Sequence, residues 1–251
     1  MMNNSKKGLF LMISLGIGVM LLSSREYLFA SQAGTLREYN PLTANWEKVD
    51  WQDKSEFLLA GSVTYEGFDF FNDASYQKFL DNTHTLSASY RPSDIVSIHS
   101  DFTANDASRF QLRQEAATKF AEMAWSFANA FDFKSRLSLT SAYRSSNYQK
   151  QLAANCSTER CASVGTSEHE AGLAVDLGVN GGNILSKDRK YYQRMQDNAH
   201  LYGFHNTYQK GVEIDGKIVE PRHWRYVGVT LATYLHDSGQ TLAEYFYSLQ
   251  L

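Results

Sequence analysis

The most regular pattern of apolar positions lies between residues 107 and 131. Apolar side chains recur there at steps of three and four residues, at Ala116, Phe120, Met123, Phe127 and Phe131. This spacing is typical of an amphipathic helix with one face against a core. We therefore predict a helix over residues 107–131 whose apolar stripe belongs to the core.

Shorter patterns follow in the middle of the chain. Alternation over residues 137–142 predicts a half-buried strand, and Ser146 followed by Gln149 predicts a helix that begins with a capping box. The apolar run over residues 173–179 carries Asp176 and predicts a buried strand. A bend is expected at Gly172, because glycine adopts backbone angles that other residues avoid.

The last third of the chain alternates between helix and strand signals. A helix is predicted over residues 186–202, with Ser186 as its N-cap and Gly203 as its end, followed by a strand over 204–208. Asp215 and Gly216 stand between two short apolar segments, which predicts a two-residue hairpin turn.

A further strand and a helix close the chain. Residues 223–227 alternate in polarity, which predicts a strand with His223 on one face, and Thr241 with Glu244 predicts a capped C-terminal helix. The order of elements favours an α+β fold with a small, mostly antiparallel sheet flanked by helices.

The N-terminus has the features of an export segment. Lys6 and Lys7 precede a 15-residue apolar run over 8–22, which is short for a membrane span of about 20 residues. Small residues near Ala30 and at 31–33 form a weak cleavage site. A cleaved signal peptide and a retained membrane anchor are the two alternatives, and both export the rest of the chain.

The 251 residues are therefore divided into three parts: a signal or anchor over 1–33, a membrane-proximal or accessory region over 34–85, and a main domain over 86–251. The 24 Lys and Arg residues nearly balance 27 Asp and Glu residues, giving a net charge of -3. This balance argues against nucleic acid as a partner. Oligomeric state leaves no recognisable signal in the sequence.

Cys156 and Cys161 are the two cysteines of the chain, and four polar residues separate them. An exported protein encounters an oxidising compartment, where such a pair is expected to form a disulfide. A zinc site built on these cysteines is the weaker alternative, because no histidine is near them in the sequence.

Four residues of two segments form the chemical centre of the sequence: His169, Asp176, Glu220 and His223. They supply two imidazole ligands, one carboxylate ligand and one spare carboxylate, which are the groups that a catalytic zinc requires. In a continuous helix His169 and Asp176 would lie about 10 Å apart, too far for one ion. The bend expected at Gly172 removes this difficulty.

Three motifs in this order resemble those of the zinc D-alanyl-D-alanine carboxypeptidases of the VanY type, a group that includes dipeptidases and L,D-carboxypeptidases acting on peptidoglycan. The motifs are Ser141-Ala-Tyr-Arg-Ser145 with Gln149, Ser167-Glu-His-Glu-Ala-Gly-Leu-Ala-Val-Asp176, and Glu220-Pro-Arg-His-Trp-Arg-Tyr-Val-Gly228. The sequence departs from the family at Arg222, where tryptophan is usual, and at 205–208, where an Arg-Tyr-Pro-like stretch is usual.

The resemblance implies that zinc is held by His169, Asp176 and His223 and that Glu220 is the general base. Arg144 suits a role in steadying the oxyanion, because its guanidinium stays charged and offers several donors. The resemblance also implies substrate contacts by two residues, Ser167 and Gln149. For Gln149 the alternative is completion of the helix cap with Ser146.

We therefore expect a carboxypeptidase that trims D-alanine from peptidoglycan stem peptides. A free terminal carboxylate needs a cationic partner, for which Arg222 and Arg225 are the candidates, with a structural ion pair as the alternative for Arg225. His205 is either a core residue or a contact of the site. L,D-carboxypeptidase, endopeptidase and an inactive zinc-containing wall-binding domain are the alternative functions, and the spare carboxylate of Glu220 favours the enzyme.

Overall fold

The computed structural model describes residues 67–181, 183–184 and 190–249, together with the backbone of four strands between residues 19 and 48. Two compact units are present, Met1–Ser62 and Val63–Leu251. Most of the expected signal or anchor over residues 1–33 lies outside the described residues, so it remains a prediction.

The N-terminal unit contains an antiparallel four-stranded sheet in which each strand pairs with the next. Its strands are β1 (Val19–Ser23), β2 (Glu26–Ala30), β3 (Leu36–Asn40) and β4 (Asn45–Lys48). Across the described residues of the chain, each helix falls short of the length and apolar character that a membrane crossing requires.

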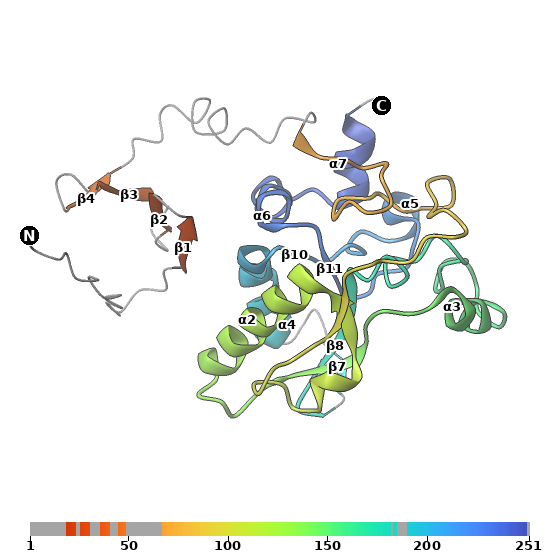
Figure 1. The fold of residues 1–251 in the computed structure, drawn as a ribbon, viewed down its shortest axis with the longest axis horizontal. Helices are drawn as coiled ribbons and strands as arrows, with labels where there is room; N and C mark the ends of the chain where they lie inside the picture. Colours follow the sequence, from red (N-terminus) through yellow and green to blue (C-terminus); the bar gives the residue numbers. More distant parts are fainter. Residues whose placement is uncertain are drawn as a thin grey trace, which may run out of the picture. The chain divides into compact units, whose positions relative to one another are not determined.

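A larger sheet forms the centre of the second unit (Figure 1). Its strand order is β10-β11-β8-β7, with β9 also paired to β8, and all of these pairs are antiparallel. The strands are β7 (Leu137–Ser141), β8 (Ala174–Val179), β9 (Asn183–Ile184), β10 (Phe204–His205) and β11 (His223–Tyr226). The expected mixed fold with a small antiparallel sheet is confirmed.

The long helix α2 (Gln114–Ala130) begins seven residues later than predicted. The preceding residues form the 3₁₀ turn η3 (Ala107–Arg109) and the strand β6 (Gln111–Arg113), which pairs with β5 (Ile95–Ser97). The segment forms a strand instead of the first turns of the helix because Arg113 also donates its backbone N–H to the Gly172 carbonyl. This bond holds the segment next to the bend before β8. Of the predicted apolar stripe, Ala116, Phe120, Met123 and Phe127 are buried in α2, whereas Phe131 is its C-cap and is only partly buried.

Helices α3 (Ser146–Ala153) and α4 (Lys190–Asn198) confirm two further predictions with altered ends. Ser145, one residue earlier than predicted, caps α3 by accepting a hydrogen bond from the Tyr148 N–H, so the expected box is wrong. The 3₁₀ turn η4 (Ala199–Tyr202) extends α4 to Gly203, whose φ of 79° ends it as predicted. Ser186 lies outside the described residues.

The predicted hairpin around Asp215 and Gly216 is wrong. Residues Val212–Asp215 form the short helix α5, and Gly216, with φ of 69°, is its C-cap. The side chains of Val212 and Ile214 are exposed, so this segment does not form the buried apolar face that a hairpin strand would have. The predicted strand over 204–208 is likewise shorter, being confined to β10.

Two helices end the chain. Thr241 and Glu244 form both arms of the predicted capping box at the start of α7 (Leu242–Ser248). Helix α6 (Val229–Ser238) was not predicted from the sequence, and its N-cap is Gly228, which has φ of 82°.

Apolar side chains form two cores in the second unit. The sheet core joins α2 and α4 to strands β7, β8 and β11, and in Figure 1 these helices lie to one side of β7 and β8 while α3 lies to the other. The terminal core joins Phe70 and Phe79 to α6 and α7. Residues 67–85, assigned by sequence to the accessory region, thus contribute to the same compact unit as the peptidase motifs.

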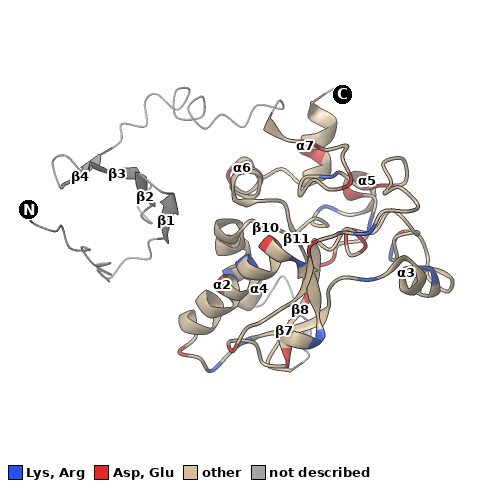
Figure 2. Ribbon diagram, viewed as in Figure 1, with Lys and Arg blue, Asp and Glu red and all other residues tan. Residues whose placement is uncertain are grey.

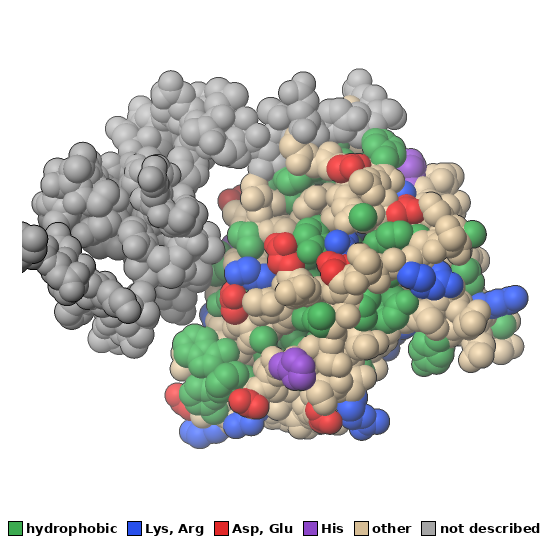
Figure 3. All heavy atoms as spheres, viewed as in Figure 1, with side chains coloured by type: hydrophobic (Ala, Val, Ile, Leu, Met, Phe, Trp, Pro, Cys, Tyr) green, Lys and Arg blue, Asp and Glu red, His purple; other side chains and the backbone are tan. Residues whose placement is uncertain are grey.

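Charged residues of both signs are spread along the described ribbon (Figure 2), and on the face seen in Figure 3 they alternate with apolar side chains. This distribution agrees with the nearly balanced composition.

Candidate active site

The register of the central sheet brings two of the expected ligands together. Asp176 on β8 and His223 on β11 are directly opposed in the antiparallel pair, a position that places Cβ atoms about 5 Å apart. Gly172 has φ of 70°, and a Cβ there would lie 2.6 Å from Ile95 Cδ1. The predicted bend is therefore confirmed, and it brings His169 close to Asp176 and His223.

His169, Asp176 and His223 each have a ligand atom within 4.8 Å of the others, and all three residues are buried. Their imidazole nitrogens and carboxylate oxygen match the three protein ligands of a catalytic zinc, which leaves a fourth position open. The donor set therefore fits the expected metal.

Hydrogen bonds orient the ring of His169. Its Nδ1–H donates to the Ala142 carbonyl at 2.7 Å, because that oxygen can only accept. Nε2 then carries the lone pair and lies 3.5 Å from Asp176 Oδ2. Burial lowers the pKa of His169, despite the opposing effect of Asp176. The neutral form that a metal ligand needs is thus favoured.

His223 is oriented in the opposite sense. Its Nε2 lies 2.7 Å from Glu168 Oε2, and its Nδ1 lies 3.4 Å from Asp176 Oδ1. The ring of Tyr208 stacks against the imidazole with a centroid distance of 4.7 Å. Burial alone would lower the pKa of His223, but its bonds to Asp176 and Glu168 prevail and raise it to about 9. These two carboxylates therefore favour the protonated form of His223 when no metal is bound.

Glu168 is a residue of the candidate site that sequence reasoning missed. Its carboxylate accepts hydrogen bonds from Arg225 Nη1 at 2.7 Å and Thr207 Oγ1 at 2.9 Å, in addition to its contact with His223. Burial would raise the pKa of Glu168, but Arg225 and His223 outweigh it and lower the pKa to about 2. A charged carboxylate is therefore fixed behind the candidate ligand His223, the arrangement typical of metal-bound histidines.

Arg225 is fully buried, and its guanidinium also donates to the Lys78 carbonyl. The ion pair with Glu168 is therefore the alternative that the structure favours. The candidate substrate contact of Arg225 is corrected accordingly, since its guanidinium donates to Glu168 and to the backbone instead. The residues around Arg225 on β11 do not indicate in the sequence that Glu168 is its partner.

Glu220 lies beside the ligand group without belonging to it. Arg222 links the two, with its Nη2 3.3 Å from Glu220 Oε1 and its Nε 4.0 Å from Asp176 Oδ1. The Arg222 side chain is 40% exposed, whereas that of Glu220 is 17% exposed. A partly exposed cation and a spare carboxylate therefore stand at the open side of the site.

Asn206 fixes the backbone on which Glu220 and His223 stand. Its Nδ2 donates to the Glu220 carbonyl at 2.8 Å and to the His223 carbonyl at 2.5 Å. Tyr192 in turn donates its hydroxyl to Asn206 Oδ1 at 3.0 Å. Sequence reasoning missed Asn206, because the residues around β10 do not indicate that this side chain binds the carbonyls of Glu220 and His223, which are distant in the sequence.

Arg144 contacts Asp176 from the other side, with Nη2 2.8 Å from Oδ2. Its Nε donates to Ser141 Oγ at 2.9 Å, and its Nη1 lies 3.5 Å from Gln149 Oε1. Gln149 is buried and donates its Nε2 to the Ala162 carbonyl at 2.6 Å, so it does not complete a cap with Ser146. Ser167 is also buried, at the start of the turn that carries His169.

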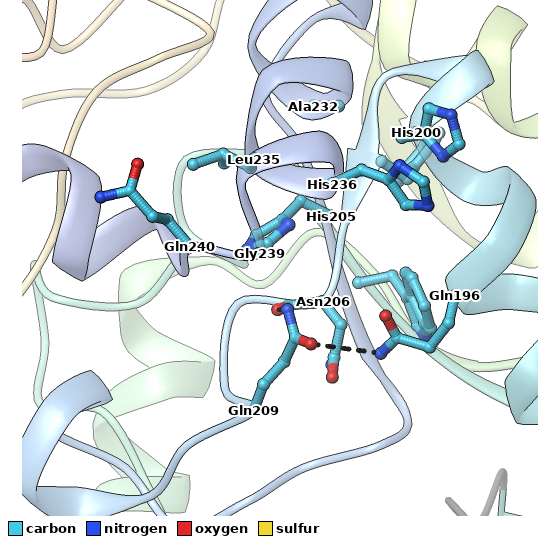
Figure 4. A pocket seen from close by; sticks show the side chains of 12 residues that line it. Gln196, His200, His205, Asn206, Gln209, Ala232, Leu235, His236, Gly239 and Gln240 are labelled. Carbon is cyan, nitrogen blue, oxygen red and sulfur yellow. Dashed lines mark hydrogen bonds between the residues drawn. The ribbon is translucent and has the colours of Figure 1, made fainter. Parts of the chain in front are cut away.

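His205 is not part of the group of three candidate ligands. It lines a cavity of about 110 Å³ together with His200 and His236, and none of the ligands contributes to its walls (Figure 4). The rings of His200 and His236 stack at 3.7 Å. Burial lowers the pKa of His205 to about 4, which agrees with the interpretation of His205 as a neutral core residue.

The expected disulfide between Cys156 and Cys161 is present, with a Cα–Cα distance of 5.8 Å. The weaker alternative, a zinc site on these cysteines, is therefore wrong, because both sulfur atoms are in the disulfide.

A candidate metal group with a spare carboxylate beside it fits the class of metal-dependent hydrolases. Comparison with known proteins narrows this class. The family model described as VanY, D-alanyl-D-alanine carboxypeptidase, matches residues 109–229. The protein named "Putative carboxypeptidase YodJ" of Bacillus subtilis is 32% identical over 192 residues, which cover 70% of this chain and 68% of YodJ. The D-alanyl-D-alanine carboxypeptidase of Enterococcus faecalis is 42% identical over 82 residues, 32% of this chain and 30% of that enzyme.

Solved structures of peptidases have a fold similar to that of this chain. The LdcB LD-carboxypeptidase is similar with a TM-score of 0.61 and 30% identity, covering 73% of this chain and 92% of that chain. A vancomycin-resistance D,D-pentapeptidase VanY variant in complex with Zn(II) has the same fold, with a TM-score of 0.53, 24% identity and coverage of 67% and 97%. The chain belongs to the VanY family of D-alanyl-D-alanine carboxypeptidases. The expectation of a zinc metallopeptidase is thus confirmed.

Proposed function

We propose that the protein removes the C-terminal D-alanine from peptidoglycan stem peptides that end in D-Ala-D-Ala. The observation that carries this proposal is the buried group of His169, Asp176 and His223 with Glu220 beside it. The enzymatic activity named for the Enterococcus faecalis relative supports the choice of substrate.

In this proposal His169, Asp176 and His223 hold zinc, which when bound lowers the pKa of a water molecule from 15.7 to about 7. Glu220 is not a ligand, so its carboxylate can accept the proton of the attacking water and pass it to the leaving amine. The hydrogen bond from Asn206 to the Glu220 carbonyl supports this role, because it holds the base in register with His223.

Arg144 is proposed to donate to the carbonyl oxygen of the scissile bond as negative charge develops there. Its contacts with Ser141 and Gln149 support this role, since they hold the guanidinium at the edge of the ligand group. Gln149 uses both ends of its amide within the protein, so we propose that it acts through Arg144. Ser167 keeps its proposed contact with the substrate.

Arg222 is proposed to bind the free terminal carboxylate of the substrate. Its side chain is partly exposed, and its hydrogen bond to Glu220 leaves further donors of the guanidinium for a forked contact. A tryptophan, usual at this position in the family, could not supply that contact. The substitution therefore suggests that the carboxylate is recognised here by a residue particular to this chain.

An L,D-carboxypeptidase is the second candidate function. The similarity to the LdcB LD-carboxypeptidase, which covers nearly all of that chain, supports it. In that case the substrate would be a stem peptide ending in a single D-alanine, and the roles proposed for Glu220, Arg144 and Arg222 would be unchanged.

Either substrate lies outside the cytoplasmic membrane, so we propose that the protein acts there. Export through residues 1–33, as a signal or an anchor, and an oxidising compartment for the disulfide both agree with this location. We propose that residues 63–251 form the peptidase domain, because residues 67–85 belong to the same compact unit as the motifs, and that residues 34–62 separate it from the membrane.

The test uses the full chain loaded with zinc and three peptides, ending in D-Ala-D-Ala, in D-Ala-D-Ala amide and in a single D-Ala, with products followed by mass spectrometry. We expect rapid release of D-alanine from the first and roughly thirtyfold slower cleavage of the amide, because one charge-assisted contact of about 2 kcal/mol is lost.

Each other outcome has a distinct meaning. Equal rates on acid and amide would reject a carboxypeptidase and favour an endopeptidase. Selective cleavage of the peptide with a single D-Ala would favour the L,D activity. Zinc binding without turnover of any peptide would favour the wall-binding alternative.

A further inference from the structure

The segment that carries Glu220 has no regular structure of its own. Residues 217–222 connect helix α5 to strand β11, and they form neither a helix nor a strand. A general base must be held close to its working position, and a displacement of about 1 Å can cost about 10²-fold in rate. Contacts from outside the segment must therefore supply this order.

Two of these contacts come from the loop that the disulfide closes. Ile218 donates its backbone N–H to the Glu159 carbonyl at 3.0 Å, and Lys217 donates its Nζ to the Thr158 carbonyl at 2.7 Å. Lys217 is 9% exposed, so its charge is largely removed from water. A cation at this depth needs a partner, and the Thr158 carbonyl supplies one.

The loop itself has little else to hold its shape. Residues 157–160 are all exposed, so apolar packing does not fix them. Within the loop, the Ser157 carbonyl accepts hydrogen bonds from the N–H groups of Arg160 and Cys161, at 3.0 and 2.9 Å. The covalent link between Cys156 and Cys161 closes this turn, and a cross-link restricts the alternative conformations of the chain that it encloses.

The residue that follows the loop reaches the other side of the site. The Ala162 carbonyl accepts a hydrogen bond from Gln149, whose Oε1 lies 3.5 Å from Arg144 Nη1. The disulfide loop thus adjoins the supports of both Glu220 and Arg144, although it contains none of the candidate ligands.

We infer that the loop closed by Cys156 and Cys161 is a positioning element of the active site, which keeps residues 217–222 in place for Glu220. This inference rests on the proposed function for the role of Glu220. It predicts that opening the disulfide lowers kcat at temperatures at which the protein is still fully folded. A disulfide that only stabilised the fold would lower Tm and leave kcat unchanged.

The first experiment reduces the disulfide of the zinc-loaded full chain with a phosphine. The phosphine takes the oxygen of one water molecule and becomes its oxide, while the two protons and two electrons convert the S–S bond to two thiols. At 25 °C, with Tm and zinc content measured in parallel, we expect kcat to fall roughly tenfold, with zinc retained. Thiol titration verifies complete reduction.

The double variant Cys156→Ser, Cys161→Ser is the control for the reductant. It should have the lowered kcat from the outset and should not respond to the phosphine, whereas a phosphine effect on the metal would lower its activity further. Hydrogen–deuterium exchange supplies a readout that does not depend on the substrate. Amides of residues 217–222 should exchange faster after reduction, while those of α2 should not.

A second variant separates the loop contact from the disulfide. Lys217→Met removes the bond to Thr158 while the disulfide stays closed, so it should lower kcat several-fold and increase exchange in the same segment. Lys150→Met, at an exposed position on α3, is the matched control and should behave like the wild type.

Unchanged exchange over 217–222 after complete reduction would overturn the inference, as would increased exchange with unchanged kcat. If the wild type turns over none of the peptides, the proposed function fails. The exchange experiment alone then decides whether the loop holds the segment.

Discussion

The two cores of the peptidase unit differ in what holds them together. Beside the candidate site, the sheet core encloses charged side chains, with Glu168, Asp176 and Arg225 all at most 3% exposed. The terminal core combines aliphatic side chains with aromatic rings, of which Phe79 and Phe246 stack with centroids 4.0 Å apart. One region therefore depends on the pairing of charges and the other on the burial of apolar area.

This difference separates function from stability. Buried ion pairs contribute little net stability, because desolvation offsets their attraction, but the loss of one partner is costly. Buried aromatic rings contribute through their area and leave a cavity when they are removed. Changes near the site should therefore affect catalysis and metal binding first, and changes in the terminal core should affect unfolding alone.

The largest expected effect is that of Glu220→Gln. This change keeps the size of the side chain and removes its basic carboxylate, so we expect kcat to fall by about 10²- to 10⁴-fold. Zinc content and Tm should stay close to those of the wild type, because Glu220 is not a candidate ligand. Steady-state kinetics with metal analysis measures both, and unchanged turnover would remove Glu220 from the mechanism.

Phe246→Ala tests the opposite region. Phe246 is buried in α7 between Phe70 and Phe79, so its loss should lower the free energy of unfolding by about 3–5 kcal/mol. Because none of the three candidate ligands belongs to the terminal core, kcat and zinc affinity should be unchanged below Tm. Urea denaturation measures the first quantity, with Phe71→Ala as the control, since half of that side chain is already exposed.

A drop in kcat for the folded Phe246→Ala variant would show that the two regions are coupled. The comparison between a catalytic and a stabilising core would then no longer hold.

Glu168→Gln is expected to have a smaller effect, on metal affinity. Its amide can no longer present a negative charge to His223, and removal of such a partner typically costs 10- to 100-fold in affinity. Competition with a chelator measures this loss. The control is Glu170→Gln, a buried neighbour whose carboxylate instead accepts the N–H of Gly165 at 2.9 Å. Equal zinc affinity of both variants would contradict the role of Glu168.

The sequence predicted those features that depend on local rules. The strand predicted over 173–179, which is found as 174–179, the bend at Gly172 and the cap by Thr241 and Glu244 each follow from a few neighbouring residues. The hairpin at Asp215 failed because the same turn chemistry also ends a short helix. There the Asp215 carboxylate accepts the N–H groups of Gln209 and Lys210.

Contacts between distant residues were beyond the sequence. Glu168 and His223 are 55 residues apart, and Asn206 and His223 are 17 apart. Only the register of β8, β10 and β11 brings them together. The same register decides that Arg225 faces Glu168 instead of the substrate. The pattern of residues in a single sequence does not fix this strand register. The candidate ligands could therefore be predicted, but Glu168 and Asn206, which hold His223 in place, could not.

The smallest expected effect concerns Asp81, which anchors the turn before His84 to the terminal core. Its carboxylate accepts the N–H groups of Thr83 and His84, both at 2.7 Å, and the hydroxyl of Tyr247. Burial would raise the pKa of Asp81, but the Tyr247 and backbone hydrogen bonds outweigh it and lower the pKa from 3.8 to about 2.

Because the pKa of Asp81 is lower in the folded state than in the unfolded state, its contribution to stability is present above about pH 4 and is lost as the pH falls towards 2. Asp81→Asn should therefore unfold more easily than the wild type at pH 5, and the difference should shrink towards pH 2. Urea denaturation of the zinc-free proteins at several pH values measures this, so that loss of metal does not contribute. Asp132→Asn is the control, because that side chain is 87% exposed and should give a difference that does not vary with pH. A constant difference for Asp81→Asn as well would show that its hydrogen bonds do not depend on the charge.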